Sequence, residues 1–294
     1  MLSWLPTGPL WRLAERSVLW PTLLMVIALP VVTWVIRRRA SAAVSARAVV
    51  FMVVVLLAFA GIDPAWAFPP RQPLDFLPLF AGVAGVGDRI LHLRHQPTRR
   101  RLLFLFLILT GTVATLMAPL LLSQLILVLG TAALSGMIGS ASWLLLEQID
   151  KKVAPTGMLP LVSIAAANLV IAPWTGSLLL GELGGSLAAS LAVWMLWAYP
   201  SRLPLTSVGD GVRGFTVVFL SGLLLMEGVY SATPVDLLAT LLAAVPLTAL
   251  LTHFLGRRPL RPARFLLAVA CAAALPAVIA ILMAHGIYVA QGGY

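Results

Sequence analysis

Apolar runs of about twenty residues recur along the whole chain, and short polar segments rich in arginine, proline and glycine separate them. An α-helix needs about 20 apolar residues to cross the roughly 30 Å hydrocarbon core of a bilayer. The pattern therefore predicts an all-α, polytopic transmembrane bundle of about ten helices in a single domain, residues 1–294. The expected spans are residues 17–36, 48–66, 74–93, 102–121, 123–146, 157–174, 177–199, 214–230, 235–255 and 265–290.

Helix-breaking residues divide two of the longer apolar stretches. Pro119 separates the fourth span from the fifth, and residues 173–176 separate the sixth from the seventh, because proline removes a helix donor. Pro78, with Gly82 and Gly85 after it, is typical of a discontinuous helix within the third span.

The composition and the charge pattern agree with this reading. Hydrophobic residues make up 61% of the chain and charged residues only 10%, which excludes an ordinary soluble domain. With ten spans, all of the 20 basic residues except Arg12, Arg16 and Arg71 fall in loops on one side. Lys and Arg accumulate in cytoplasmic loops, so both termini are expected on the non-cytoplasmic side. The net charge of +10 is thus interpreted as a topology signal rather than as nucleic-acid binding, with anionic lipids as the expected partners of these loops.

The choice of basic and aromatic residues indicates the kind of membrane and the helix ends that lie at its surface. The strong preference for arginine over lysine and the short loops favour a bacterial inner membrane. Tryptophan is enriched at membrane interfaces, where its ring anchors a helix at the headgroups. The sequence therefore predicts such anchors at Trp20, Trp34, Trp143, Trp174 and Trp197, which lie near expected span ends.

Ionisable and amide side chains inside the spans are the first candidates for function, because a charge there costs at least ~2.5 kcal/mol unless it is paired or hydrated. Glu182 is the clearest example, and it lies in a glycine-rich segment, Gly181–Gly185, whose spacing favours close helix packing. The candidate transport or ion site consists of Glu182, Asn168, Glu227 and Asp63. The alternative for Glu182 is a structural glutamate that is hydrogen-bonded to a neighbouring helix.

Five carboxylates gather near the predicted outer ends of the spans: Asp63, Asp75, Glu182, Glu227 and Asp236. They could form a vestibule that attracts cations. Acidic residues at helix N-termini, such as Asp75 and Asp236, are also ordinary partners of the helix dipole.

A glycine-rich loop, Gly209-Asp210-Gly211-Val212-Arg213-Gly214, matches G-x-G-x-x-G without the strand that a dinucleotide site requires. Backbone amides in such a turn can bind phosphate when basic side chains lie nearby. The candidate headgroup or phosphate site is therefore Arg202, Gly209, Gly211 and Arg213, and the alternative is a plain tight turn between two spans.

Two resemblances accompany these patterns. The string Pro204, Thr206, Gly209, Gly211 and Arg213 resembles the P-x-S-x-x-G-x-G-x-R-E loop in the membrane domain of lysylphosphatidylglycerol synthases and related flippases, which implies a link to lipid flipping. The likeness covers about ten residues, and Gly214 replaces the glutamate. Segments 176–185 and 228–234, with the turn 68–70, are similar to uncharacterised bacterial multi-pass membrane proteins without an assigned function.

Motifs for enzymatic chemistry are missing from the sequence. It contains no G-x-S-x-G, H-E-x-x-H or C-x-x-C pattern, so no catalytic residue, metal or cofactor is predicted. The leading hypothesis is a transporter or flippase for a small molecule or lipid. The alternatives are a non-catalytic subunit or scaffold of a larger complex, with a membrane-protein partner or a second copy, and a lipid-active membrane enzyme.

Overall fold

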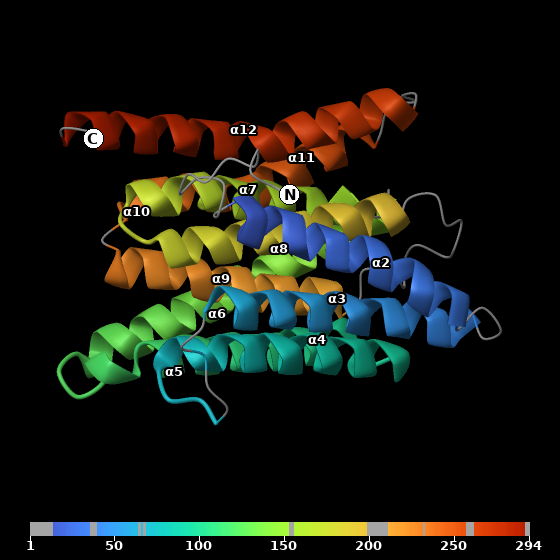
Figure 1. The fold of residues 1–294 in the computed structure, drawn as a ribbon, viewed down its shortest axis with the longest axis horizontal. Coiled ribbons are helices and arrows are strands. Elements are labelled where there is room, and N and C mark those ends of the chain that lie inside the picture. Colours follow the sequence, from blue (N-terminus) through green and yellow to red (C-terminus); the bar gives the residue numbers. More distant parts are fainter. Residues whose placement is uncertain are drawn as a thin grey trace, which may run out of the picture.

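Helices form every regular element that the structure describes, so the all-α class is confirmed. The structure is a computed structural model, and it describes residues 14–35, 40–63, 66, 69–152, 156–198, 211–231, 233–256 and 262–291. The helices run side by side along one long axis, with α12 at one edge of the view and α4 and α5 at the other (Figure 1). Between these edges lie α7, α8 and α9.

The elements follow the apolar runs of the sequence. In chain order they are η1 (Glu15–Leu19), α2 (Trp20–Val35), α3 (Ala40–Ile62), η2 (Pro73–Phe76), α4 (Leu77–Leu93), α5 (Thr98–Leu116), η3 (Ala118–Leu120), α6 (Leu125–Lys152), η4 (Thr156–Met158), α7 (Leu159–Trp174), α8 (Leu178–Ala198), α9 (Val212–Tyr230), α10 (Val235–Leu242), α11 (Ala244–Leu255) and α12 (Pro262–Ala290).

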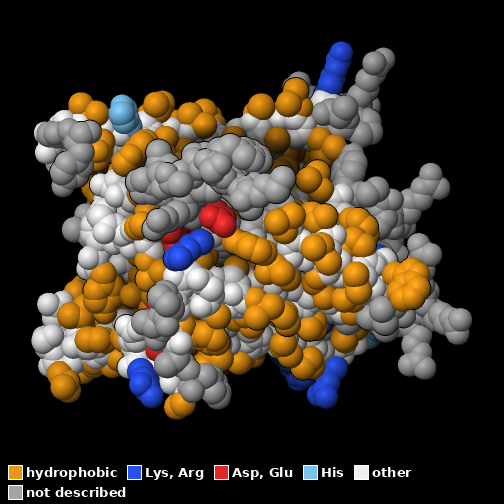
Figure 2. Space-filling model, in the orientation of Figure 1, with side chains coloured by type: hydrophobic (Ala, Val, Ile, Leu, Met, Phe, Trp, Pro, Cys, Tyr) orange, Lys and Arg blue, Asp and Glu red, His pale blue; other side chains and the backbone are white. Residues whose placement is uncertain are grey.

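Eight helical stretches among the described residues have the length and apolarity to cross a membrane. They are Glu15–Trp34, Pro73–Leu93, Leu125–Lys151, Thr156–Trp174, Leu178–Ala198, Val212–Tyr230, Val235–Leu255 and Arg264–Ala290. The apolar part of α3, Ala46–Ile62, is shorter, and α5 begins with three arginines. Hydrophobic side chains also spread over much of the face shown in Figure 2. The chain is therefore of the multi-pass membrane type, while the count of about ten spans and the sides of the termini stay predictions.

Both expected helix breaks are confirmed. After α5 ends at Leu116, the short η3 contains Pro119, and α6 begins only at Leu125. In the second break, α7 ends at Trp174 and Gly176 has a φ of 101°, a left-handed conformation that glycine adopts readily.

The expected discontinuity in the third span is wrong. Pro78 lies in the first turn of α4, where a missing amide donor breaks no helical bond, and α4 continues without interruption to Leu93. A break occurs instead inside the predicted span 235–255, where α10 ends at Leu242. Pro246 stands four residues later, and its ring would clash with the Leu242 carbonyl group in a continuous helix.

The tightest helix pair, α7 and α8, meets through glycines. A Cβ atom at Gly181 would lie 2.8 Å from Pro173 Cδ, and one at Gly185 would lie 2.8 Å from Leu169 Cδ1. The close packing predicted from the glycine spacing is therefore confirmed.

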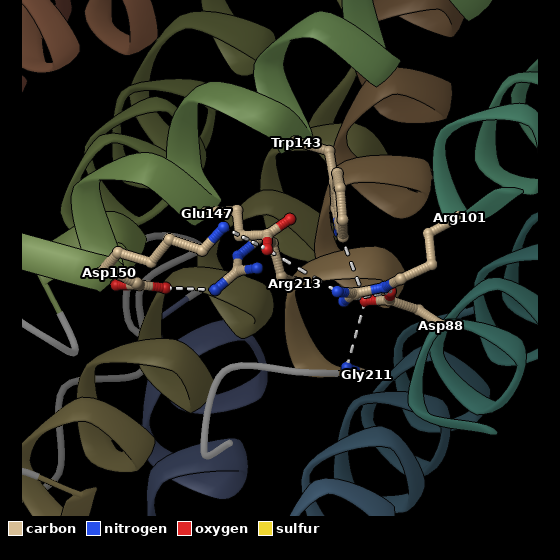
Figure 3. A network of polar contacts seen from close by, with 8 residues as sticks. Asp88, Arg101, Trp143, Glu147, Asp150, Gly211 and Arg213 are labelled. Carbon is tan, nitrogen blue, oxygen red and sulfur yellow. Dashed lines mark hydrogen bonds and ion pairs between the residues drawn. The ribbon is translucent and has the colours of Figure 1, made fainter. Parts of the chain in front are cut away.

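The tryptophans predicted as membrane anchors differ in solvent exposure. Trp20 and Trp34 are 55% and 70% exposed, as an interfacial anchor should be. Trp143 is fully buried, so the anchor expected there is wrong. Its indole ring lies instead within a group of buried charges at the ends of α4, α5, α6 and α9 (Figure 3).

Candidate functional site

Glu227 is a fully buried acid one turn before the end of α9. Its backbone carbonyl accepts hydrogen bonds from the Ser231 and Thr233 amides, which close the helix end. Neither side-chain oxygen accepts a hydrogen bond of ordinary geometry from any residue that the structure describes. A buried carboxyl group in this setting must be held as the neutral acid or with a cation, because an isolated buried charge is very costly.

Asn168 of α7 faces this carboxyl group across the helix interface. Its side chain is fully buried and interacts with the Glu227 carboxyl group as a hydrogen-bond partner, although outside ordinary hydrogen-bond geometry. The amide nitrogen Nδ2 donates to the Leu180 carbonyl oxygen at 3.3 Å, whereas Oδ1 has no partner among the described residues. Gly184 makes room for it, since a Cβ atom there would lie 2.9 Å from Asn168 Cβ. The Glu227–Asn168 pair thus places three oxygen atoms at the junction of α7, α8 and α9, and none of them accepts a hydrogen bond of ordinary geometry from a described residue.

Glu182 points in a different direction. It lies in the second turn of α8 and is buried, with Arg16 of η1 close enough to interact with it electrostatically. Leu180 and Gly184, two positions to either side, face Asn168, and residues two apart on a helix face away from each other. The structure therefore pairs Asn168 with Glu227 and directs Glu182 toward η1.

The remaining carboxylates of the predicted outer group have separate environments. Asp63 is buried just after α3, and its backbone carbonyl accepts the Trp66 amide at 3.1 Å. Asp75 is fully buried, and its Oδ2 accepts the backbone amides of Arg71 and Gln72 at 2.9 and 3.0 Å. The alternative interpretation of Asp75, an acid that caps its own helix, is thus supported. Asp236 is exposed in the first turn of α10.

A second polar centre joins α4, α5, α6 and α9, and we call it the ion-pair network (Figure 3). It comprises Asp88, Arg101, Trp143, Glu147, Asp150 and Arg213. Asp88 Oδ1 accepts from Arg101 Nε and Nη2 at 3.2 and 2.9 Å. Asp88 Oδ2 accepts from Trp143 Nε1 and from the Gly211 amide, each at 3.3 Å. These four donors fully engage a carboxylate that has no exposed surface.

The other half of the ion-pair network fastens α9 to α6. Arg213 Nη2 donates to Asp150 Oδ2 at 2.5 Å, and Asp150 Oδ1 accepts the Gly157 amide at 2.7 Å. The guanidinium groups of Arg101 and Arg213 lie 4.5 and 5.7 Å from the centre of the Trp143 ring, within cation–π range. Glu147 lies 3.7 Å from Arg101 Nη1 and 2.9 Å from Lys151 Nζ.

Glycines allow the backbones of α4 and α9 to approach at this point. Gly211 has a φ of 86°, and a Cβ atom there would lie 3.0 Å from the Gly85 carbonyl oxygen. A Cβ atom at Gly214 would lie 2.9 Å from Asp88 Cβ. The glycine-rich turn is therefore needed for close helix packing.

The predicted headgroup site is described only in part. Arg202 and Gly209 lie outside the described residues. The Gly211 amide and the Arg213 guanidinium both bind carboxylates of the protein, so an anion at these groups would compete with Asp88 and Asp150. The headgroup site stays a prediction.

Sequence reasoning missed the acidic members of the ion-pair network. Asp88, Glu147 and Asp150 stand at the arginine- and lysine-rich ends of their helices, and the spacing of Glu147 and Lys151 is a common helical ion-pair signal. Arg101 and Arg213 are buried in ion pairs, a role that the interpretation of the basic residues as a topology signal did not include, and the topology itself stays a prediction.

Comparisons with known proteins give no relative for this chain. No protein-family model, no characterised protein and no solved structure matches it. The two resemblances noted in the sequence therefore stay predictions.

Proposed function

We propose that this chain is a bacterial inner-membrane transporter or flippase with about ten spans, and that the Glu227–Asn168 pair holds its coupling proton or cation. The observation that carries the proposal is the fully buried Glu227 carboxyl group, which accepts no hydrogen bond of ordinary geometry from a described residue and has the Asn168 side chain as its polar neighbour. Ionisable groups within membrane-spanning helices are costly, and they commonly mark ion or proton pathways.

Comparison with Asp88 strengthens this argument. Asp88 is equally buried, and it receives four hydrogen bonds from Arg101, Trp143 and Gly211. A glutamate with a purely structural role should be satisfied in the same way, because an unsatisfied buried polar group costs about 1–3 kcal/mol. Glu227 has no comparable set of donors among the described residues, with the Asn168 side chain as its polar neighbour, as expected for a group that exchanges a small ligand.

Ion-dependent stability tests the proposal without knowledge of the substrate. Purified protein is melted in sodium, potassium or choline chloride at constant ionic strength, and over a range of pH. A proton or cation bound only to the folded protein stabilises it by mass action, by about 2.7 kcal/mol at 100 times its dissociation constant. We expect such a dependence in the wild type and in the exposed control Asp236→Asn, and its loss in Glu227→Gln. If the wild type and Glu227→Gln showed the same dependence of melting temperature on ion and pH, Glu227 would not hold the proposed proton or cation.

A non-catalytic subunit or scaffold is the second candidate. The ion-pair network supports it, because buried charge pairs fasten one end of α4, α5, α6 and α9. Purification in a gentle detergent followed by mass spectrometry separates the two candidates. A stoichiometric protein partner would favour the subunit, and a lone protein with a specific metabolite would favour transport.

A further inference from the structure

A groove of 410 Å³ opens on the outer surface of the bundle between α5 and α6. The α5 wall consists of Arg99, Leu102, Leu103 and Phe106. The α6 wall consists of Met137, Ser140, Ala141 and Leu144. Each set follows the i, i+3, i+4, i+7 spacing of one helix face, so the groove extends about 10 Å along both helices at 1.5 Å per residue.

The two ends of the groove differ. At one end Phe106 packs onto α6, since a Cβ atom at Gly136 would lie 3.0 Å from its ring. The other end of the groove carries Arg99. This end lies near the same end of α5 as the ion-pair network, because Arg101, two residues after Arg99, contacts Glu147 of α6. The groove is therefore apolar along its length, closed at one end and cationic at the other.

Three consecutive arginines begin α5, and each has a different environment. Arg101 is buried against Asp88, and Arg100 Nη1 donates to Gln96 Oε1. Arg99 is exposed and makes no ion pair with a described residue. Inside the groove, the buried Ser140 hydroxyl also has no hydrogen-bond partner among the described residues. Arg99 is thus the cation that remains available at the mouth of an apolar groove.

We propose that this groove binds an anionic phospholipid, with the headgroup-proximal part of one acyl chain between α5 and α6 and the phosphate group on Arg99. An acyl chain matches the apolar walls, and a negative headgroup complements the arginine. A second copy of the chain or a partner helix fits less well, because the groove ends at Phe106 after about two turns and a packed helix would bury the Arg99 charge. The bound lipid is independent of any role of Glu227.

Lipid binding is measured on the purified full chain by native mass spectrometry during titration with dioleoylphosphatidylglycerol or dioleoylphosphatidylcholine. We expect phosphatidylglycerol to bind the wild type about fivefold more tightly than phosphatidylcholine, from about 1 kcal/mol per basic side chain near an anionic lipid. Arg99→Gln should abolish this preference, and Arg100→Gln is the matched control that should keep it. Ala141→Phe fills the groove and should weaken the binding of both lipids, whereas Ala166→Phe, at an exposed alanine of α7, should leave their binding unchanged.

The same titration can overturn the proposal. Equal affinity of the wild type for the two lipids, or an unchanged preference in Arg99→Gln, would exclude the headgroup contact. Unchanged lipid binding in Ala141→Phe would exclude the groove as the lipid-binding site. If the wild type were a dimer that dissociates in Ala141→Phe, the groove would be a contact between two copies of the chain. Because Arg99 is exposed, Arg99→Gln should melt at the wild-type temperature, which separates loss of binding from loss of fold.

Discussion

Arg213, in the first turn of α9, donates from Nη2 to Asp150 Oδ2 near the end of α6, at 2.5 Å. Both side chains are buried, and Trp143 lies beside the Arg213 guanidinium group. A charge pair that excludes water is sensitive to the loss of one partner, because the other charge is then left uncompensated. Loss of either partner is therefore expected to weaken this end of the bundle.

Removal of one charge from this pair should destabilise the protein strongly. Asp150→Asn removes the buried negative charge that Arg213 Nη2 contacts, and we expect a loss of about 3–5 kcal/mol in the free energy of unfolding. Asp236→Asn, at an exposed acid, is the control and should change it by less than about 0.5 kcal/mol. Thermal or denaturant unfolding in detergent, followed by tryptophan fluorescence, measures both. Equal stability of the two variants would contradict the assigned importance of the pair.

Glycine-to-alanine substitutions at two helical positions should change the stability of the protein in opposite directions. Gly214→Ala places a Cβ atom 2.9 Å from Asp88 Cβ and 3.0 Å from the Ala84 carbonyl oxygen, so it should lower the melting temperature. Gly286→Ala in α12 meets nothing within 4 Å and should stabilise its helix by up to about 1 kcal/mol. Differential scanning fluorimetry compares the two variants. A neutral Gly214→Ala would show that α4 and α9 do not depend on this close approach.

Two isosteric substitutions distinguish the structural acid from the proposed functional acid. Asp88→Asn weakens the contacts with Arg101 and leaves that guanidinium group buried, so stability should fall by several kcal/mol, about 3 or more. Glu227→Gln removes no hydrogen bond of ordinary geometry between described residues, and the new amide can still interact with Asn168, so in choline chloride its melting temperature should equal or exceed that of the wild type. If Glu227→Gln were the more damaging of the two, Glu227 would be a structural residue.

The positions of the helices can be predicted from the sequence, because each membrane-spanning helix must contain enough apolar residues to cross the bilayer and must form its backbone hydrogen bonds internally. The sequence is less informative about side-chain environments. Trp143 has the position of an interfacial anchor in the sequence, but it is buried and donates to Asp88 of α4, a contact between distant residues that no local pattern indicates. Likewise, Glu227 and Asn168 were both candidates in the sequence, but no spacing between them indicates that they meet. The break at Leu242 could have been expected from Pro246.

Infrared difference spectroscopy of the protein in lipid vesicles can establish whether Glu227 is an exchanging ion site, because it detects the carboxyl group of Glu227 itself. A wild-type carboxyl signal that is absent from Glu227→Gln and retained in Asp236→Asn would belong to Glu227. We expect this signal to shift promptly in D₂O or to respond to an added cation, since a transport site must exchange its ligand with water. A Glu227 signal that resists both D₂O and cations would contradict this role and identify a sealed structural acid.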